Sequence, residues 1–231
     1  MRRFGNIARV AIAMVERQSG ESVYNFPMAS AKKTNREVEI KVRVPDVALM
    51  RRLLQRAGAV AQRRVFEQNA LFDTLAADLR ARGRLVRLRV ETPVTEFGKR
   101  SGAASALLTA KSPASDRPRS AKRSKYKERM EREVPIRNTA KLLARLAALG
   151  LKSGFRYEKY RTSYRLGSLH VELDETPVGT FLELEGTPDA IDAAAHQLGV
   201  RSKDRLLATY WGVYADDCRR RGVRPTNMLF R

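Results

Sequence analysis

Glu37-Val38-Glu39-Ile40-Lys41 is the most informative stretch of this chain, because charged and aliphatic residues alternate along it without a break. Successive side chains of a β-strand point to opposite faces. The run therefore predicts a strand with one charged face and one apolar face. A single strand of this kind is weak evidence, since any antiparallel sheet with one face in water shows the same pattern.

The same alternation returns in at least five later segments. Its charged positions are spaced two apart; they are Arg87, Arg89, Glu91, Lys111, Glu131, Glu133, Lys159, Arg161, Glu172, Asp174, Glu183 and Glu185. Ordinary solvated sheet faces mix uncharged polar residues with their charges, whereas these positions are almost all ionised. Cations match phosphate oxygens, and carboxylates hold the divalent ions that accompany phosphate chains. The repeated pattern therefore favours a phosphate-binding site over an ordinary wet surface.

Four charge motifs occur in an order that resembles the CYTH group of triphosphate tunnel metalloenzymes, over about residues 37–215. The resemblance lies in residues 37–41, 158–164 and 171–186. The group takes in class IV adenylyl cyclases, thiamine triphosphatases and inorganic triphosphatases. The resemblance implies an α+β fold, in which an eight-stranded antiparallel β-barrel encloses a polar tunnel and helices pack outside.

Amphipathic stretches that could cover the apolar outside of such a barrel are present at 45–59, 138–149 and 187–198. Each has a start or stop signal of the usual kind: Gly58 and Gly150 end the first two helices, and Thr187-Pro188-Asp189 opens the third. A further helix is predicted over 204–219. We interpret its aromatic residues as packing groups rather than as a platform for a ligand.

Length and composition favour one catalytic domain with peripheral additions, since 231 residues with 43% hydrophobic content can bury a sizeable core. We predict a basic, disordered arm at 1–33, a tunnel domain at 34–215 that includes a basic loop at 112–125, and a basic tail at 216–231. Residues 1–36, 111–129 and 201–231, which contain these three segments, carry +16 of the net charge of +21. These segments could attract polyphosphate or RNA weakly, although a solvated basic surface explains them as well.

Other features limit the possible classes. No apolar run reaches the roughly 18 residues that a membrane helix needs, and the lone Cys218 cannot form an internal disulfide. We therefore predict a cytoplasmic protein without membrane insertion, either a monomer or a homodimer. His170 and His196 show no zinc spacing, and no glycine-rich phosphate loop is present, so phosphate binding would rest on side chains.

The resemblance assigns roles to individual residues. Glu37, Glu39 and Lys41 would be catalytic. A small triphosphate substrate would be bound by Lys41, Arg87, Arg89, Lys111, Lys159 and Arg161. One or two Mg²⁺ or Mn²⁺ ions would be held by Glu37, Glu39, Asp174, Glu183 and Glu185, with Glu131, Glu133 and Glu172 as second choices. Repulsion among the tunnel cations also predicts that Arg161→Ala unfolds at a higher temperature.

Three functions remain open, and we rank a metal-dependent triphosphatase first. A class IV adenylyl cyclase is second, because Asn35-Arg36 stands where some bacterial cyclases of the group carry His-Phe, and because Glu183 and Glu185 are both retained. A noncatalytic binder of polyphosphate or RNA is third.

Overall fold

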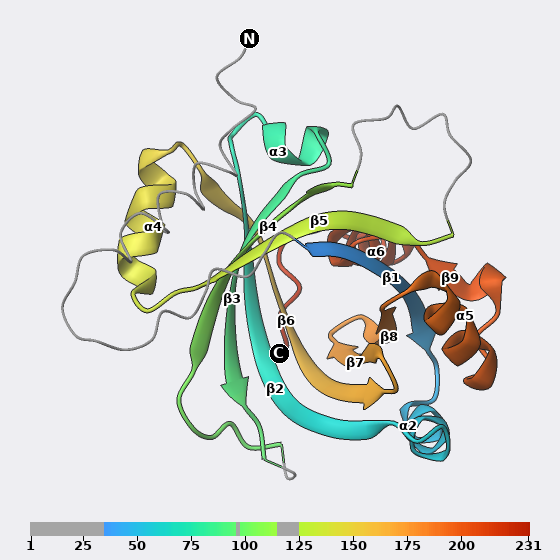
Figure 1. The fold of residues 1–231 in the computed structure, drawn as a ribbon. Coiled ribbons are helices and arrows are strands. Elements are labelled where there is room, and N and C mark those ends of the chain that lie inside the picture. The colour runs from blue at the N-terminus through green and yellow to red at the C-terminus, as the bar shows by residue number, and fades with distance from the viewer. Residues whose placement is uncertain (1–34, 96–97, 115–124) are drawn as a thin grey trace.

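The computed structural model describes residues 35–95, 98–114 and 125–231. Its main feature is a closed antiparallel β-barrel (Figure 1). The eight strands are β1 (Asn35–Val44), β2 (Val60–Asp73), β3 (Leu85–Pro93), β4 (Ser105–Pro113), β5 (Lys127–Pro135), β6 (Lys152–Leu166), β7 (Leu169–Thr176) and β8 (Gly179–Glu185). They follow the order β5-β4-β3-β2-β6-β7-β8-β1, and the pairing of β5 with β1 closes the barrel. The predicted fold class is confirmed.

Helices and one short strand lie outside the barrel (Figure 1). The helices are α2 (Val47–Arg56), α3 (Asp78–Ala81), α4 (Thr139–Ala148), α5 (Pro188–Gln197), the 3-10 turn η2 (Ser202–Asp204) and α6 (Tyr210–Arg220). The extra strand, β9 (Arg205–Leu206), pairs with β1. Three helices start where the sequence predicts, because Asp46, Asn138 and Thr187 each accept a hydrogen bond from the first-turn backbone.

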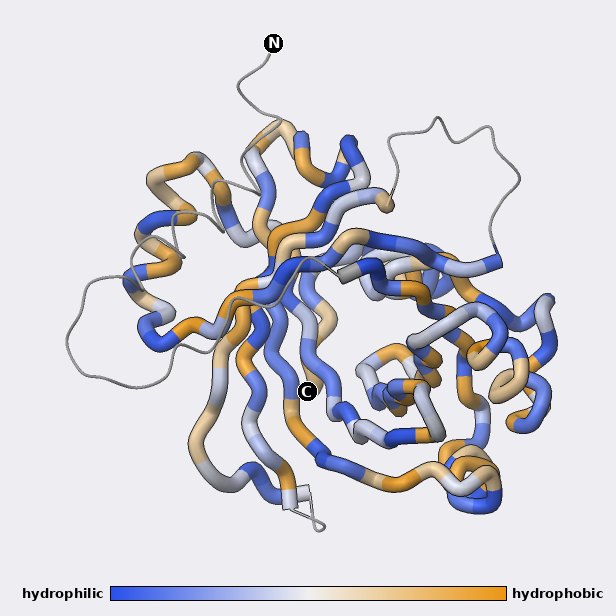
Figure 2. The backbone as a smooth tube through the Cα atoms, in the orientation of Figure 1, coloured by the Kyte–Doolittle hydropathy of each residue, from blue (hydrophilic) through white to orange (hydrophobic). Residues whose placement is uncertain are grey.

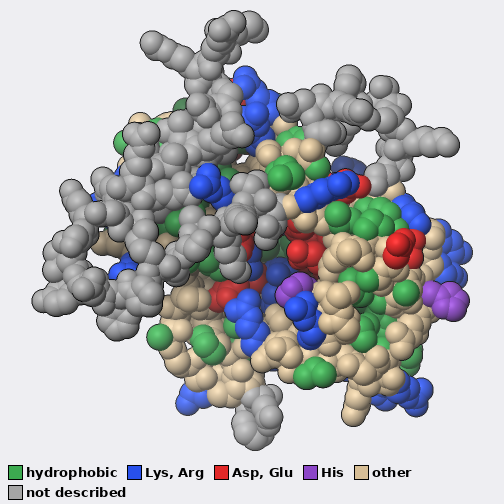
Figure 3. All heavy atoms as spheres, viewed as in Figure 1, with side chains coloured by type: hydrophobic (Ala, Val, Ile, Leu, Met, Phe, Trp, Pro, Cys, Tyr) green, Lys and Arg blue, Asp and Glu red, His purple; other side chains and the backbone are tan. Residues whose placement is uncertain are grey.

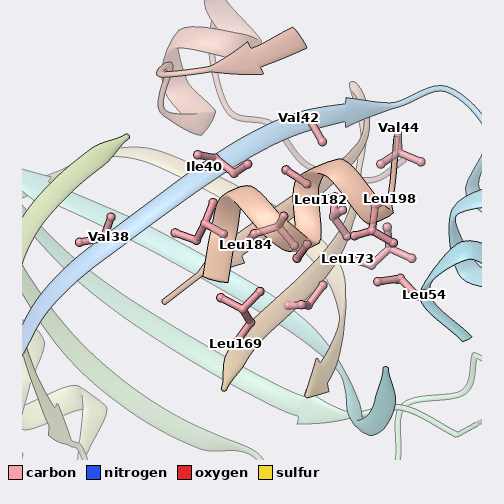
Figure 4. Close-up of a cluster of buried hydrophobic side chains, with 14 residues drawn as sticks. Val38, Ile40, Val42, Val44, Leu54, Leu169, Leu173, Leu182, Leu184 and Leu198 are labelled. Atoms are coloured by element: carbon pink, nitrogen blue, oxygen red, sulfur yellow. The ribbon is translucent and has the colours of Figure 1, made fainter. Parts of the chain in front are cut away.

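The apolar faces of the strands point outward, under the helices. Apolar and polar residues alternate along several strands, β1 among them (Figure 2). Ile40 and Leu184 pack under α5 and α2 in the largest apolar cluster (Figure 4), and a second cluster lies under Leu142 and Leu146 of α4. Each buried aliphatic side chain contributes about 1.5 to 3 kcal/mol. This outer packing stabilises the barrel and leaves the inner faces free for charged residues.

The helix predicted over 204–219 begins later than expected. Arg205 and Leu206 pair with β1 instead, and α6 starts after Thr209, whose hydroxyl accepts a hydrogen bond from the Gly212 backbone. The hydrogen bonds to β1 outweigh the local helical pattern at these positions. Such long-range pairing leaves no trace in local periodicity.

The C-terminal segment packs against the barrel. The Glu158 backbone donates to the Met228 carbonyl, and the Met228 backbone donates to the Arg156 carbonyl. Met228 is buried, and Phe230 contacts Phe66 and Tyr160. Residues 228–230 thus cover part of β6. No helix in the part of the chain that the structure describes is long and apolar enough to cross a membrane.

The predicted arm at 1–33 and most of the predicted loop at 112–125 lie outside the described residues.

Candidate active site

The inner faces of the strands enclose a charged cavity of about 400 Å³. Positive and negative side chains meet in the hollow at the centre of Figure 3. Its lining includes the cations Lys41, Arg87, Arg89, Lys111, Lys127, Arg129, Lys159 and Arg161 and the carboxylates Glu37, Glu39, Glu131, Glu133, Glu172, Glu183 and Glu185. The cavity is therefore dense in charge and nearly balanced in sign.

Most of these carboxylates come from three neighbouring strands, β1, β5 and β8. We call this group the acidic wall; its members are Glu37, Glu39, Glu131, Glu133, Glu183 and Glu185. Strand register places Glu39 directly opposite Glu185. Lysines neutralise part of this wall: Lys111 Nζ lies 2.7 Å from Glu37 Oε2, and Lys127 pairs with Glu39. The acidic wall is thus a group of carboxylates held together by ammonium groups.

Glu185 is the carboxylate that this arrangement affects most. Burial raises its pKa to about 7, and repulsion from Glu37, Glu131 and Glu39 acts in the same direction against the attraction of Lys111. Burial and Glu37 likewise raise the pKa of Glu131. A cation bound among crowded carboxylates stabilises their ionised form, because it offsets the repulsion between them.

The opposite side of the cavity is the basic wall, formed by Arg87 and Arg89 of β3 and Lys159 and Arg161 of β6. Burial by itself would lower the pKa of Arg161, but the nearby Asp174 and Glu67 raise it well above its usual value. The pKa of Lys159 is also raised by these two carboxylates, against burial and the Arg161 charge. Lys159 and Arg161 therefore stay charged. A positive wall facing a negative one suits a polyanion that carries metal ions.

The structure brings the predicted phosphate-binding cations together. All six line the cavity: Lys41, Arg87, Arg89, Lys111, Lys159 and Arg161. Two of these six cations, Arg87 and Arg89 of the basic wall, have a buried Nε atom without a hydrogen-bond partner. These N–H groups are donors that an anion could satisfy.

The predicted carboxylates also line the cavity, with the exception of Asp174. Asp174 is fully buried behind the basic wall. Its Oδ1 accepts from Arg161 Nε at 2.7 Å, and its Oδ2 accepts from Lys159 Nζ at 2.7 Å and from the Tyr210 hydroxyl at 2.5 Å. Both oxygens of Asp174 already accept hydrogen bonds, so in this structure Asp174 acts as a counterion of the basic wall.

The same contacts bear on Arg161. Its Nη2 also lies 2.7 Å from Glu183 Oε2. Arg161 is therefore held by attraction to buried carboxylates, and its removal would leave Asp174 undercompensated. The expectation that its loss relieves repulsion is not supported by these contacts.

Several cavity residues were not predicted from the sequence. Lys127 and Arg129 belong to the same β5 face as Glu131, and extending the alternation backwards by two steps would have found them. Glu67, which is buried beside the cavity without lining it, was not predicted either, because it lies on β2 between Phe66 and Gln68, where charged and aliphatic residues do not alternate regularly. Tyr210 packs against Tyr157 and Phe181 as predicted for its helix, but it also lines the cavity, with Lys41 Nζ 3.8 Å from its ring centre.

The acidic wall has the donors that a hard divalent cation prefers, which are carboxylate oxygens. Within the described ranges, no three Asp, Glu, His or Cys side chains already lie together as a metal site. Lys111 forms an ion pair with Glu37, and Lys127 forms one with Glu39. Glu37, Glu39, Glu131 and Glu185 nonetheless fit a hard divalent cation, because bound positive charge would relieve the repulsion that the other three carboxylates exert on Glu185.

Residues 35–210 match the family model of the CYTH domain. The chain belongs to the CYTH domain family. This family includes triphosphatases and adenylyl-cyclase-like members, and its tunnel enzymes generally depend on a divalent metal. The family expected from the charge motifs is confirmed.

Solved structures share the fold at low sequence identity. A candidate adenylate cyclase from Vibrio parahaemolyticus is 20% identical with a TM-score of 0.62, covering 78% of this chain and 98% of its own. The PH1819 protein from Pyrococcus horikoshii is 20% identical with a TM-score of 0.59, covering 78% and 99%. HpAC1 from Hippeastrum, a candidate adenylyl cyclase with a dominant triphosphatase activity, is 21% identical with a TM-score of 0.52, covering 82% and 97%. A search of curated proteins finds no match.

Proposed function

We propose that this CYTH domain is a metal-dependent triphosphatase that hydrolyses inorganic triphosphate or a small organic triphosphate. The observation that carries this proposal is the division of the cavity into a basic wall and an acidic wall. A triphosphate chain needs cationic donors along its oxygens, and its metal ions need carboxylates on the other side. This cavity offers both.

The cations of the basic wall would bind the phosphate oxygens and orient the reacting phosphorus for in-line attack. Their side chains are already fixed by buried carboxylates, so little reorganisation is needed when the substrate binds. Lys41, held 3.1 Å from Glu183 Oε1, would contact the chain from the acidic side. The largely buried cavity also limits access of bulk water to the charged groups.

Glu37, Glu39 and Glu185 would hold the divalent ion, with Glu131 beside them. When bound, that ion would neutralise charge on the phosphate chain and favour formation of the attacking hydroxide. A carboxylate of the acidic wall would position the attacking water and accept its proton.

Adenylyl cyclase activity is the second candidate. Leu71, Leu85 and Trp211 line the cavity and provide apolar surface that could contact a nucleobase. HpAC1, a candidate cyclase of similar fold, shows a dominant triphosphatase activity, which supports the hydrolase as the first choice.

We place the activity in the cytoplasm, since the lone Cys218 is buried and unpaired.

A substrate panel tests this proposal. Inorganic triphosphate, thiamine triphosphate and ATP would be incubated with Mg²⁺ or Mn²⁺, and phosphate, pyrophosphate and cyclic AMP would be measured separately. Release of phosphate that Glu39→Gln abolishes would support the triphosphatase. Cyclic AMP would favour the cyclase, and tight binding without any product would favour a noncatalytic binder.

A further inference from the structure

Glu67 is a buried carboxylate behind the basic wall that does not line the cavity. It lies on β2, between β3 and β6, and strand register places it opposite Lys159. Its side chain is completely shielded from solvent. A buried carboxylate at such a depth needs charged partners, because desolvation of an ion is costly.

Three cations of the basic wall surround Glu67. Lys159 Nζ lies 3.4 Å from Oε2, Arg89 Nη1 lies 3.5 Å from Oε1, and Arg161 Nε lies 3.6 Å from Oε1. The Asn69 side chain donates to Oε2 at 3.3 Å. Burial alone would raise the pKa of Glu67, but these cations hold it well below its usual value.

The distances show that Glu67 is shared among the cations. The contacts of Asp174 with Lys159 and Arg161 are 2.7 and 2.6 Å, so Asp174 pairs tightly with two side chains of β6. Glu67 is farther from each cation, but from β2 it contacts both Lys159 and Arg161 of β6 and Arg89 of β3. It is thus a counterion that joins the two strands of the basic wall.

We propose that Glu67 is a positioning residue: it holds Arg89, Lys159 and Arg161 at a fixed spacing that matches the transition state of triphosphate hydrolysis, without touching the substrate. This inference rests on the proposed function, because it takes these cations to be the phosphate-binding groups. A negative charge behind the cations weakens their attraction for an anion in the ground state. The gain is geometric, since cations that are fixed in advance need no rearrangement during the reaction.

The test separates binding from turnover. Glu67→Gln keeps the shape of the side chain and removes its charge, and Glu67→Asp keeps the charge but withdraws it by one methylene group. Glu175→Gln is the matched control, because Glu175 lies on the outer face of β7 and also pairs with two cations, Arg51 and Arg64. Thermal unfolding of each variant would be recorded first. Tripolyphosphate binding would be measured by calorimetry in metal-free buffer, and kcat and KM would be measured with Mn²⁺.

For Glu67→Gln we expect kcat to fall more than about tenfold, while tripolyphosphate binds more tightly than to the wild type. Glu67→Asp should fold and bind normally and should also lose kcat, which keeps the test valid if Glu67→Gln does not fold. Glu175→Gln should change neither quantity. An unaltered kcat in Glu67→Asp, or a parallel loss of binding and kcat in the Gln variant, would overturn the positioning role.

Failure of the proposed function gives a different result. If the wild type binds tripolyphosphate but hydrolyses no triphosphate, the triphosphatase assignment is wrong and the positioning of a transition state falls with it. Tighter binding by Glu67→Gln would then still identify Glu67 as the counterion of the anion-binding cations. Unchanged binding would exclude that role as well.

Discussion

Glu39 of β1 and Glu185 of β8 lie directly opposite each other on the inner face of the barrel. Burial raises the pKa of Glu185, and repulsion from Glu37, Glu131 and Glu39 adds to this effect against the attraction of Lys111. Glu185 therefore keeps its proton to about pH 7. The first prediction follows from this pair.

Glu185→Gln should change how the stability of the protein depends on pH. The folded-state pKa of Glu185 is raised from 4.5 to about 7, so the folded state binds more protons than the unfolded state in this window. The stability that Glu185 contributes is present below about pH 4.5 and is lost as pH rises through 7, by on the order of 2 to 3 kcal/mol. Glu185→Gln should remove this loss. Its unfolding temperature relative to the wild type should thus be higher at pH 8 than at pH 5; an equal difference at both values would contradict the shift.

Glu39→Gln should abolish the response to divalent metal. The carboxylate of Glu39 is a predicted metal ligand on the acidic wall, and its neutral amide should bind Mn²⁺ weakly. We expect the rise in unfolding temperature caused by Mn²⁺ to disappear, since a ligand stabilises only the state that binds it. Metal-supported turnover should be lost as well. Glu128→Gln, on the outer face of the neighbouring strand β5, is the control and should respond to Mn²⁺ like the wild type.

Arg161→Ala should lose both turnover and stability. The guanidinium binds Asp174 and Glu183 and lines the cavity. Its removal should cost about 2 to 4 kcal/mol of transition-state stabilisation. It should also cost about 3 to 5 kcal/mol of folding free energy, because Asp174 is left buried with less compensation. Arg156→Ala, which changes an exposed arginine of the same strand that does not line the cavity, is the control for urea unfolding and kinetics. A more stable Arg161→Ala variant would show that repulsion dominates the basic wall.

Met228→Ala should destabilise the protein by about 2 to 5 kcal/mol. Met228 is 1% exposed and packs in the cluster that contains Phe155 and Tyr157. Leu229→Ala removes a similar volume from a side chain that is 39% exposed and should have little effect. Equal changes in urea unfolding for the two variants would mean that the C-terminal segment does not pack as described.

Removal of residues 1–33 should preserve turnover of small triphosphates. Every described residue that lines the cavity lies between Glu37 and Trp211. We propose that the basic arm acts through salt-sensitive attraction to polyphosphate or RNA. The truncated protein should therefore keep its maximal rate at low and moderate salt and lose only the salt-dependent binding. A large fall in maximal rate at both salt concentrations would show that the arm takes part in the site.

The sequence by itself determined the inward and outward faces of most strands. Alternation with period two is a local property, so the run from Glu37 to Lys41 was enough to place three charges on one face. Helix starts were also determined locally, because the cap residues Asp46, Asn138 and Thr187 bond within their own first turn. The order of the charge motifs then identified the family.

Only the tertiary structure decided how these faces meet. Closure of the barrel depends on the pairing of β1 with β5, and the late start of α6 depends on β9 pairing with β1. The burial of a charged side chain depends on the residues of the neighbouring strands. Asp174 and Glu185 have similar sequence patterns, yet Asp174 is tied to Arg161, Lys159 and Tyr210 while Glu185 faces other carboxylates. Electrostatic environment is set by contacts between residues far apart in the chain, which a local pattern does not contain.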